Sequence, residues 1–259
     1  MSLSGRVALV TGGSRGIGRA IAIALAEDGA DVAVNYRRDD AAAKETVAAI
    51  EQLGRRGRAY AAAVESADDV RRMVEAVLAD FGFVDILVNN AGIASRGQSV
   101  AKTDPAELER VVRVHALAPH LLCQLVLPSM RGRPRGDIVM ISSVATLHYD
   151  PGGAPYSMGK AAMEALAFTL SKEVKKQGIR VNVVAPGLVE TEMGRRLMKA
   201  AAGVDDLRKL DAAMPFGRVC QPEDVANVVR WLVSDRASYI TGEKINVYGG
   251  ATPSSGGPR

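Results

Sequence analysis

The segment Thr11-Gly12-Gly13-Ser14-Arg15-Gly16-Ile17-Gly18 stands between a short apolar run, Val7–Thr11, and a helical pattern, Arg19–Asp28. Glycines at such a point let the backbone turn sharply and approach a pyrophosphate, and the start of the following helix offers free N–H groups and a favourable dipole. The spacing is Gly-x-x-x-Gly-x-Gly rather than the commoner Gly-x-Gly-x-x-Gly, so the glycines alone are weak evidence. Their position between a strand and a helix favours dinucleotide binding. The predicted contacts are Gly12, Ser14, Arg15, Gly16, Ile17 and Gly18.

Short apolar segments alternate with longer helical patterns along the remainder of the chain. Most of these segments are continuously apolar, as in strands of a parallel sheet that is covered on both faces. This rhythm predicts an α/β fold, with a doubly wound (Rossmann-type) parallel sheet and helices on both faces. The expected strands are Val7–Thr11, Val32–Asn35, Arg58–Ala62, Ile86–Asn89, Ile138–Ser142, Val181–Ala185 and Ile245–Val247. The expected helices are Arg19–Asp28, Ala41–Leu53, Val70–Phe81, Pro105–Met130, Ser157–Gln177 and Pro222–Ser234.

The bulk composition fits one domain over residues 1–259. The chain has 259 residues, 47% of them hydrophobic, and no linker or internal repeat divides it. Two segments depart from the alternation. Residues 192–215 are helical in composition but fall between a strand and a helix, which suggests a substrate lid. Residues 252–259 are rich in Pro, Ser and Gly, and we expect a frayed tail there.

Charge and cysteine content bear on partners and compartment. The formal net charge is +4, from 33 basic and 29 acidic residues, and no long basic run accompanies it, so we expect no nucleic-acid partner. The densest basic stretch, Arg131–Arg135, is interpreted as a solvated loop, with a docking patch for an acidic partner as the alternative. Cys123 and Cys220 fit no metal spacing. The start of the chain lacks a signal-peptide pattern, and no apolar run approaches about 18 residues. We therefore expect a reduced, cytoplasmic protein with no metal and no membrane span.

The end of the second expected strand bears on the choice of nicotinamide cofactor. A site for NAD places an acidic residue there to accept hydrogen bonds from the ribose hydroxyls. The sequence reads Asn35-Tyr36-Arg37-Arg38, with no carboxylate before Asp39. Arg15 and Arg37 together suit the 2′-phosphate of NADP(H), through charge-assisted hydrogen bonds. NADP(H) is therefore favoured over NAD(H), and the alternative is that both arginines are solvated surface residues.

Tyr156 and Lys160 lie four residues apart on an expected helix, and Ser143 lies thirteen residues before Tyr156. Residues at a spacing of four share one helix face, so both side chains can reach one ligand. Free tyrosine titrates at about 10, and a neighbouring ammonium is expected to lower its pKa by about two or three units. The phenol can then exchange a proton during hydride transfer, while the Ser143 hydroxyl donates to the carbonyl oxygen. A lone Tyr-x-x-x-Lys is common on helix surfaces, so this interpretation depends on its combination with Ser143 and the glycine loop.

Five motifs occur in order along the chain: Thr11–Gly18, Asn89-Asn90-Ala91-Gly92, Ser143, Tyr156 with Lys160, and Pro186-Gly187. Together they resemble the motifs of the short-chain dehydrogenase/reductase family, and the likeness covers nearly the whole chain. The C-terminal segments Pro222–Ala226, Ile240–Gly242 and Gly249-Gly250 are similar to the 3-oxoacyl-(acyl carrier protein) reductase branch. The resemblance implies a seven-stranded parallel sheet. It also implies a homotetramer built around the long helices.

The resemblance further implies roles for individual residues. Ser143 would position the carbonyl, Tyr156 would be the proton donor, and Lys160 would bind the nicotinamide ribose and tune Tyr156. Val189 would bond the nicotinamide carboxamide through its backbone, and Thr191 would meet the carboxamide or the pyrophosphate. The implied cofactor contacts beyond the glycine loop are Arg37, Asn89, Ala91, Gly92, Tyr156, Lys160, Pro186, Gly187, Val189 and Thr191.

Four positions are open or depart from the family pattern. Asn89 would steady the centre of the sheet and its loop beside the adenine ribose, or serve the architecture alone. His115 takes the place of the usual asparagine, which holds a water in a proton relay with the lysine. Because an imidazole can donate and accept, His115 is a catalytic candidate, with a satisfied core histidine as the alternative. Ala63 replaces the residue that usually touches adenine, and Tyr248 replaces the usual aspartate before Gly249-Gly250.

The sequence thus predicts NADPH-dependent reduction of a ketone or 3-oxoacyl group to the alcohol. The substrate would be a small carbonyl compound, free or carried as an acyl group. His148 and Tyr149 add bulk after Ser143, which favours a compact ketone, while the methionines of 192–215 suit an apolar group or simply pack the lid. The rival enzyme is an NAD-dependent dehydrogenase of a sugar or polyol. A rival of another class is a nicotinamide-binding sensor without turnover, which has no need of a tuned phenol.

Overall fold

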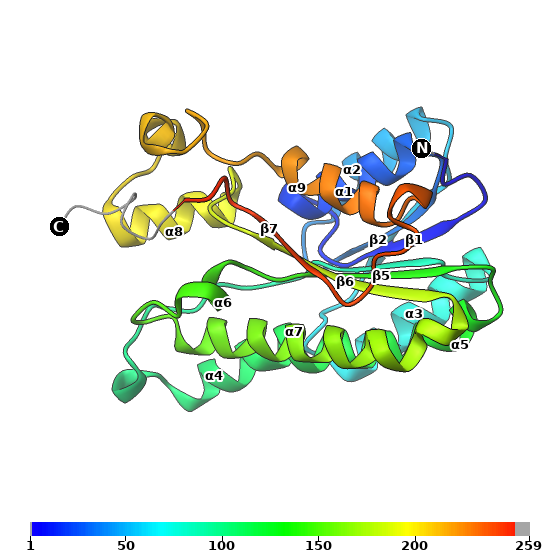
Figure 1. The fold of residues 1–259 in the computed structure, drawn as a ribbon, viewed down its shortest axis with the longest axis horizontal. Coiled ribbons are helices and arrows are strands. Elements are labelled where there is room, and N and C mark those ends of the chain that lie inside the picture. Colours follow the sequence, from blue (N-terminus) through cyan, green and yellow to red (C-terminus); the bar gives the residue numbers. More distant parts are fainter. Residues whose placement is uncertain (1, 252–259) are drawn as a thin grey trace.

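The computed structural model describes residues 2–251, so the tail expected at 252–259 lies outside the described residues. At its centre is one parallel sheet in the order β3-β2-β1-β4-β5-β6-β7 (Figure 1). The seven-stranded parallel sheet is therefore confirmed, and each expected strand is present. The strands are β1 (Val7–Val10), β2 (Asp31–Tyr36), β3 (Gly57–Ala61), β4 (Ile86–Asn89), β5 (Gly136–Ile141), β6 (Ile179–Pro186) and β7 (Lys244–Val247).

Helices cover both faces of the sheet, so the doubly wound arrangement is confirmed as well (Figure 1). On one face, α1, α2 and α9 enclose a core that includes Leu25 and Val229. On the other face, α3, α5 and α7 enclose a core that includes Leu122 and Met163. Because both faces of the inner strands are buried, these strands are largely apolar at consecutive positions, whereas the edge strands β3 and β7 are only partly buried. The long helices are α1 (Gly16–Glu27), α2 (Asp40–Gln52), α3 (Ala67–Phe81), α4 (Pro105–Val112), α5 (Ala118–Arg131), α7 (Ala154–Val174) and α9 (Pro222–Leu232).

The segment expected to form a lid, 192–215, follows β6 and extends beyond the sheet (Figure 1). It contains α8 (Glu192–Ala202) and the 3₁₀ helix η4 (Leu207–Ala213), in agreement with its helical composition. Closure over a substrate stays a prediction. The remaining short elements are α6 (Ala145–His148), η1 (Val100–Lys102), η3 (Lys175–Gln177) and η5 (Asp235–Ala237).

The strand order reverses between β1 and β4, whose following connections lead to opposite faces of the sheet. Ligands of open parallel sheets bind in the crevice outside the carboxyl ends of the strands at such a switch point. The glycine loop Thr11–Gly18 follows β1, and Asn90 follows β4, which pairs directly with β1. The fold therefore places two of the predicted cofactor motifs at the same switch point.

Helices α4 and α5 form one helical stretch, Pro105–Arg131, because the π-helical turn η2 (Arg113–Leu117) joins them. Such turns are frequent at functional sites, and this one contains His115. By length and composition alone the stretch is long and apolar enough to cross a membrane, which the sequence analysis did not expect. Core helices of soluble proteins pass the same test, and this stretch packs along α3 and α7.

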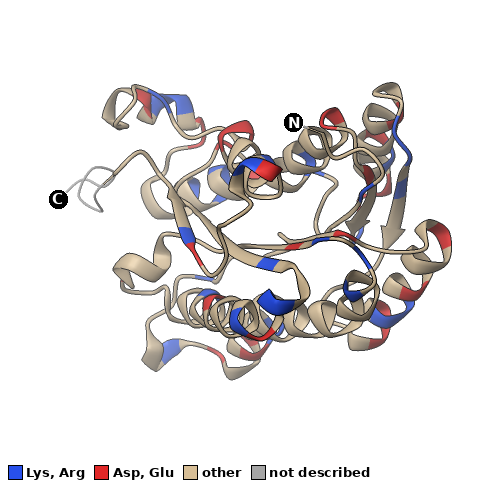
Figure 2. Cartoon of the chain, turned by 45° about the vertical axis from the view of Figure 1, so that its right-hand side comes forward, with Lys and Arg blue, Asp and Glu red and all other residues tan. Residues whose placement is uncertain are grey.

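Basic and acidic residues lie close together on the outer helices and loops (Figure 2). In the basic stretch Arg131–Arg135, Arg133 pairs with Asp85 at 2.7 Å and Arg135 pairs with Asp137 at 3.1 Å. The sequence analysis expected a solvated loop. Arg131, Gly132 and Pro134 are exposed as expected, whereas Arg133 and Arg135 are tied to the rest of the protein. The partial neutralisation of the stretch also weakens the alternative of a docking patch.

A buried ionic cluster lies at the amino ends of the central strands. Asp137 of β5 is 2% exposed and pairs with Arg6 at 2.6 Å, Arg135 at 3.1 Å and Arg180 at 2.7 Å. Arg180 is itself buried. Removing one partner from a buried ion pair leaves an uncompensated charge. The fold is therefore sensitive to the loss of Asp137.

The substitution Asp137→Asn should lower the free energy of unfolding by about 3–5 kcal/mol, because buried guanidinium groups lose their counter-charge. The melting temperature should fall by roughly 6–20 °C. Urea denaturation and thermal melting measure both quantities. The control is Asp205→Asn, which breaks an exposed pair with Lys209 and should change stability by about 0.5 kcal/mol or less. Equal effects of the two substitutions would contradict the importance of the cluster.

Candidate active site

The glycine loop is built so that only glycine fits at several of its positions. Gly12 and Gly16 have φ angles of +62° and +54°, in the left-handed region. A Cβ atom on Gly18 would collide with the carbonyl oxygen of Gly12 and the side-chain amide of Asn90. That amide donates to the carbonyls of Thr11 at 2.8 Å and Gly12 at 3.2 Å. The loop is therefore tied to the residue that follows β4.

Asn35 supports the loop from β2. Its side-chain oxygen accepts from the Gly12 N–H at 3.2 Å, and its carbonyl accepts from the Gly13 N–H at 2.8 Å. Its amide donates to carbonyls around β3, so the buried side chain is fully engaged. Ser14 is also buried and Ile17 packs against the core. We therefore expect these two residues to meet a cofactor mainly through their backbone.

Helix α1 begins at Gly16 without a side-chain cap, and its first turn holds no acidic residue. By contrast, α2, α3, α4 and α8 each begin with a side chain that accepts a hydrogen bond from the first turn. The first N–H groups of α1 are thus left without a side-chain acceptor, which suits an anion at this end. Together with the tight glycine loop, this arrangement fits the pyrophosphate of a nicotinamide dinucleotide.

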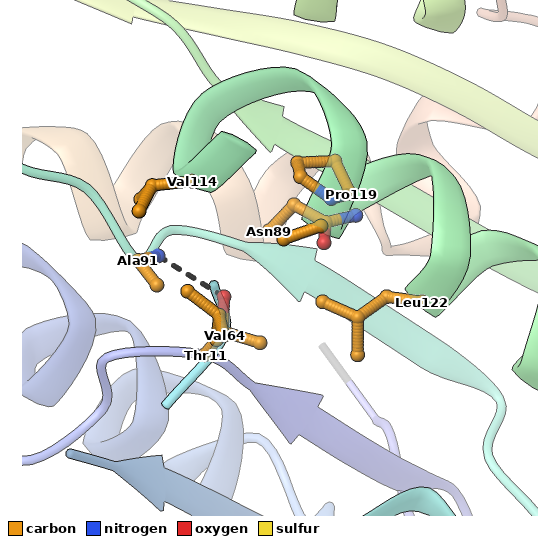
Figure 3. Close-up of a pocket in the computed structure, with 8 residues that line it drawn as sticks. Thr11, Val64, Asn89, Ala91, Val114, Pro119 and Leu122 are labelled. Atoms are coloured by element: carbon orange, nitrogen blue, oxygen red, sulfur yellow. Dashed lines mark hydrogen bonds between the residues drawn. The ribbon is translucent and has the colours of Figure 1, made fainter. Parts of the chain in front are cut away.

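Asn89 and Ala91 line a small hollow between the end of β1 and α5 (Figure 3). The Ala91 N–H donates to the Thr11 hydroxyl at 3.0 Å, which fixes the start of this loop (Figure 3). Asn89 is buried, its amide contacts the Cys123 sulfur at 3.9 Å, and its Oδ1 has no partner among the described residues. Both interpretations of Asn89, a contact beside the adenine ribose and an architectural role, stay predictions. The other lining residues are Val64, Val114, Ala118, Pro119 and Leu122.

Both arginines predicted to hold a 2′-phosphate are paired with carboxylates. Arg15 pairs with Glu192 of α8 at 2.6 Å, and Arg37 pairs with Glu65. Because both arginines are well exposed, each pair is worth little, and a phosphate can replace the carboxylate. Asp39, the first carboxylate after β2, accepts from the first turn of α2 at 3.1 Å. The acidic group nearest to the expected ribose position is therefore engaged in a helix cap.

Thr191 lies against the glycine loop, and its implied contact with the nicotinamide carboxamide or the pyrophosphate stays a prediction. A Cβ atom on Gly16 would lie 3.3 Å from the Thr191 methyl group. The Thr191 hydroxyl accepts from the Gly194 N–H at 3.0 Å and so caps α8. One residue thus joins the loop after β6, the lid segment and the predicted phosphate site.

The loop after β6 is held by C-terminal residues. Pro186 ends β6, and a Cβ atom on Gly187 would lie 2.8 Å from that of Tyr248. Tyr248, which departs from the family pattern, therefore packs directly on the loop that carries the predicted carboxamide contacts. Val189 is buried, and its backbone pairs with that of Cys220.

Ser143, Tyr156 and Lys160 converge where β5 ends beside α7. The Ser143 hydroxyl accepts from the Ala145 N–H at 3.1 Å, and its side chain hydrogen-bonds Tyr156. Lys160 is 3% exposed, and its nitrogen lies 5.7 Å from the centre of the Tyr156 ring. That nitrogen donates to the Ile141 carbonyl at 2.6 Å. The structure therefore brings together the three residues that the sequence analysis selected for chemistry.

The pKa of Tyr156 lies above its ordinary value, which is opposite to the direction expected from Lys160. Burial raises the pKa, and the hydrogen bond with Ser143 lowers it by less. The expectation was wrong because burial, which favours the neutral phenol, is the largest influence on this pKa, and the lysine nitrogen donates to the Ile141 carbonyl. A phenol that stays protonated at neutral pH is suited to donate a proton.

His115 is fully buried beside Tyr156. The two rings meet edge to face, with 5.2 Å between their centres. The imidazole Nε2 lies 2.8 Å from the Ile93 carbonyl oxygen and 3.3 Å from the Ile93 backbone nitrogen, and Nδ1 has no partner among the described residues. Cβ atoms on Gly92 and Gly159 would lie 2.8 and 2.9 Å from the His115 side chain. Both glycines therefore make room for a ring larger than the usual asparagine.

Burial, and after it the charge of Lys160, lowers the pKa of His115 to about 3. The ring is therefore neutral at physiological pH. A neutral imidazole donates at one nitrogen and accepts at the other, so the expected proton relay through His115 stays a prediction. Acceptance of a hydrogen bond from a water at Nδ1 stays a prediction.

Three important side chains received no role in the sequence analysis. Asn35 and Asn90 are polar residues at the ends of apolar strands, and both hold the glycine loop. Glu164 lies four residues after Lys160, so Tyr156, Lys160 and Glu164 repeat at helical spacing. The place of Glu164 on the same helix face as Lys160 could have been inferred from that spacing.

Comparison with known proteins agrees with this geometry. The model of a family described as Enoyl-(Acyl carrier protein) reductase matches residues 12–252. An uncharacterized oxidoreductase of Methylorubrum extorquens is 42% identical over 248 residues, which cover 96% of this chain and 98% of that protein. A 3-oxoacyl-[acyl-carrier-protein] reductase of Staphylococcus epidermidis is 38% identical over 244 residues, which cover 94% and 97% of the two chains.

Solved structures show the same likeness. A short chain dehydrogenase from Burkholderia cenocepacia, determined in complex with NADP, superposes with a TM-score of 0.87. It is 36% identical in sequence, and the match covers 96% of this chain and 99% of that chain.

The burial of Lys160 should make this residue a source of instability. Burial lowers its pKa to about 7, so the folded protein disfavours the ammonium that the unfolded chain keeps up to about pH 10.5. The substitution Lys160→Met should therefore raise the free energy of unfolding at pH 7 by roughly 1–3 kcal/mol, a gain that fades toward pH 10. Thermal melting at both pH values measures it. Lys172→Met, at an exposed position of the same helix, is the control, and a destabilised Lys160→Met protein at pH 7 would contradict the account.

Proposed function

Because the chain belongs to the short-chain dehydrogenase/reductase family, we propose that it reduces a ketone or 3-oxoacyl group to the alcohol with NADPH. Tyr156 is the proton donor in this proposal. The observation that carries it is the meeting of a protonated phenol, the Ser143 hydroxyl and the Lys160 nitrogen at the carboxyl end of β5. The family membership supports the reaction class, and the arrangement of the three side chains supports Tyr156 as the group that exchanges the proton.

The roles in the reaction follow from the chemistry of each side chain. NADPH, when bound, supplies the hydride for the carbonyl carbon. The Ser143 hydroxyl donates a hydrogen bond to the carbonyl oxygen, and Tyr156 delivers its proton to that oxygen as negative charge develops. Lys160 binds the nicotinamide ribose and stabilises the phenolate that remains. The raised pKa of Tyr156 keeps the phenol protonated at neutral pH, so the proton that this step needs is present.

Several features support NADPH over NADH. Arg15 and Arg37 are exposed cations at the two places where a 2′-phosphate is expected, and their present partners are weakly bound carboxylates. Asp39 is engaged in capping α2, so it is a poor acceptor for ribose hydroxyls. The Burkholderia cenocepacia relative binds NADP. By the same likeness, we propose that the protein is a cytoplasmic homotetramer.

The substrate class remains between a compact ketone and a 3-oxoacyl thioester. Tyr149 is 61% exposed and has a φ of +53°, so much of its side chain faces solvent instead of narrowing the site. This observation weakens the argument for a compact pocket. The pairing of Arg133 and Arg135 in turn weakens the argument for a carrier-protein dock. Both alternatives agree that the substrate is a small carbonyl compound.

The reaction is tested by the initial rate of NADPH oxidation with a panel of carbonyls. The panel runs from acetoacetyl thioesters through β-keto esters and cyclic ketones to sugars. We expect turnover of at least one member and a loss of about a hundredfold or more in kcat for Tyr156→Phe, which lacks the transferable proton. No turnover with any carbonyl, despite tight binding of NADPH, would favour the sensor alternative instead.

The cofactor choice is tested by Arg37→Ala. The dissociation constant for NADPH should rise about tenfold or more, while that for NADH should change less than about twofold, because only NADPH carries the 2′-phosphate. Fluorescence titration with each nucleotide gives both constants. Arg38→Ala removes the adjacent exposed arginine and serves as the matched control. Equal losses for both nucleotides would support an NAD-dependent dehydrogenase of a sugar or polyol.

A further inference from the structure

A polar network lies beneath the loop that carries Ser143. Its centre is Glu164 of α7, which is 9% exposed. The Ser142 hydroxyl donates to its Oε1 at 2.5 Å, and the Thr146 hydroxyl lies 2.7 Å from the same oxygen. Lys244 of β7 donates to Oε2 at 3.0 Å and to the Thr146 hydroxyl at 2.6 Å. The carboxylate therefore joins three parts of the fold: the loop and short helix after β5, the start of β7, and α7.

This network holds the chain on both sides of Ser143. Ser142 precedes that residue directly, and Thr146 follows it by three positions. The Thr146 hydroxyl also lies 2.8 Å from the Ser143 carbonyl. Since the Ser143 hydroxyl must face the substrate oxygen, a shift of this turn by about 1 Å is enough to slow a reaction substantially. Glu164 is thus placed to set the position of a group that it does not touch.

Glu164 also faces Lys160 along the helix. The two residues are one helical turn apart, and the carboxylate charge favours the ammonium form of Lys160 against the effect of burial. The other titratable groups near Lys160 are Tyr156 on α7 and His115, which is neutral at physiological pH. Lys244 pairs with the carboxylate itself.

We propose that Glu164, held by Lys244, is a positioning residue for the reduction: it fixes the Ser143 turn and supplies the negative charge that faces Lys160. This inference rests on the proposed function and extends it to two residues outside the Ser143, Tyr156 and Lys160 set. A solely structural alternative is that the pair simply ties β7 to α7. The two possibilities differ in their effect on the pH dependence of kcat.

The test uses Glu164→Gln, Lys244→Met and the double variant, with acetoacetyl-coenzyme A and ethyl acetoacetate as carbonyls. Glu164→Gln keeps the shape of the side chain and an oxygen for Ser142 but removes the charge. The matched control is Asp28→Asn, which weakens an ion pair with Arg230 at 2.8 Å, where α1 and α9 pack at the far end of α1 from the glycine loop. Rates from pH 6 to 10, melting temperatures and crystal structures are measured for each protein.

We expect Glu164→Gln to lower kcat by roughly 10- to 100-fold, with the dissociation constant for NADPH changed less than about threefold. The alkaline fall of kcat should move to lower pH by about one unit, because Lys160 loses its proton more easily without the carboxylate. The double variant should be no slower than Glu164→Gln, since the two residues act as one unit. Lys244→Arg should restore at least half of the rate that Lys244→Met loses.

Wild-type kcat and pH dependence in Glu164→Gln, with a lower melting temperature like that of Asp28→Asn, would overturn the proposal in favour of the structural alternative. If the wild-type protein reduces neither carbonyl, that result counts against the proposed function and not against the role of Glu164. The crystal structures then test whether Glu164 positions the Ser143 turn. A Ser143 hydroxyl that keeps its position in Glu164→Gln would then overturn the inference. A displaced hydroxyl would support it.

Discussion

The side-chain amide of Asn90 donates to the carbonyls of Thr11 and Gly12, and these two hydrogen bonds join the loops that follow β1 and β4. The strand order reverses between these two strands, so their carboxyl ends border the crevice where a ligand of such a sheet binds. The contact is so close that Gly18 has no room for a side chain. Together with the hydrogen bonds that the Asn90 and Ala91 N–H groups donate to the Thr11 hydroxyl, it sets the position of the glycine loop relative to β4, and so the site that the uncapped start of α1 faces.

The proposed chemistry depends on titratable side chains that are buried away from solvent. Burial raises the pKa of Tyr156 and lowers those of Lys160 and His115, so each group favours its neutral form. Hydrogen bonds from or to Ser143, Ile141 and Ile93 offset part of the desolvation. Such an arrangement reduces stability and leaves a phenol that retains its proton. A phenol that retains its proton at neutral pH can act as the acid in the proposed reduction.

Much of the fold and part of the site could be predicted because they depend on local pattern. Short apolar segments, most of them continuous, identified all seven strands, and helical spacing identified the face shared by Tyr156 and Lys160. The direction of the Tyr156 pKa could not be predicted, since it depends mainly on how deeply the folded chain buries the phenol. The pairing of Arg15 with Glu192 and of Glu164 with Lys244 was equally hidden, because the partners lie far apart in sequence.

The central claim is that the glycine loop and the Tyr156 cluster serve one bound nicotinamide nucleotide. The most direct measurement is a crystal structure of the protein with NADP⁺. We predict that the nicotinamide ring lies within about 4 Å of the Tyr156 hydroxyl, that Lys160 contacts the attached ribose, and that Arg37 contacts the 2′-phosphate. A nicotinamide ring remote from Tyr156, with Lys160 free of any contact to the nucleotide, would contradict the account.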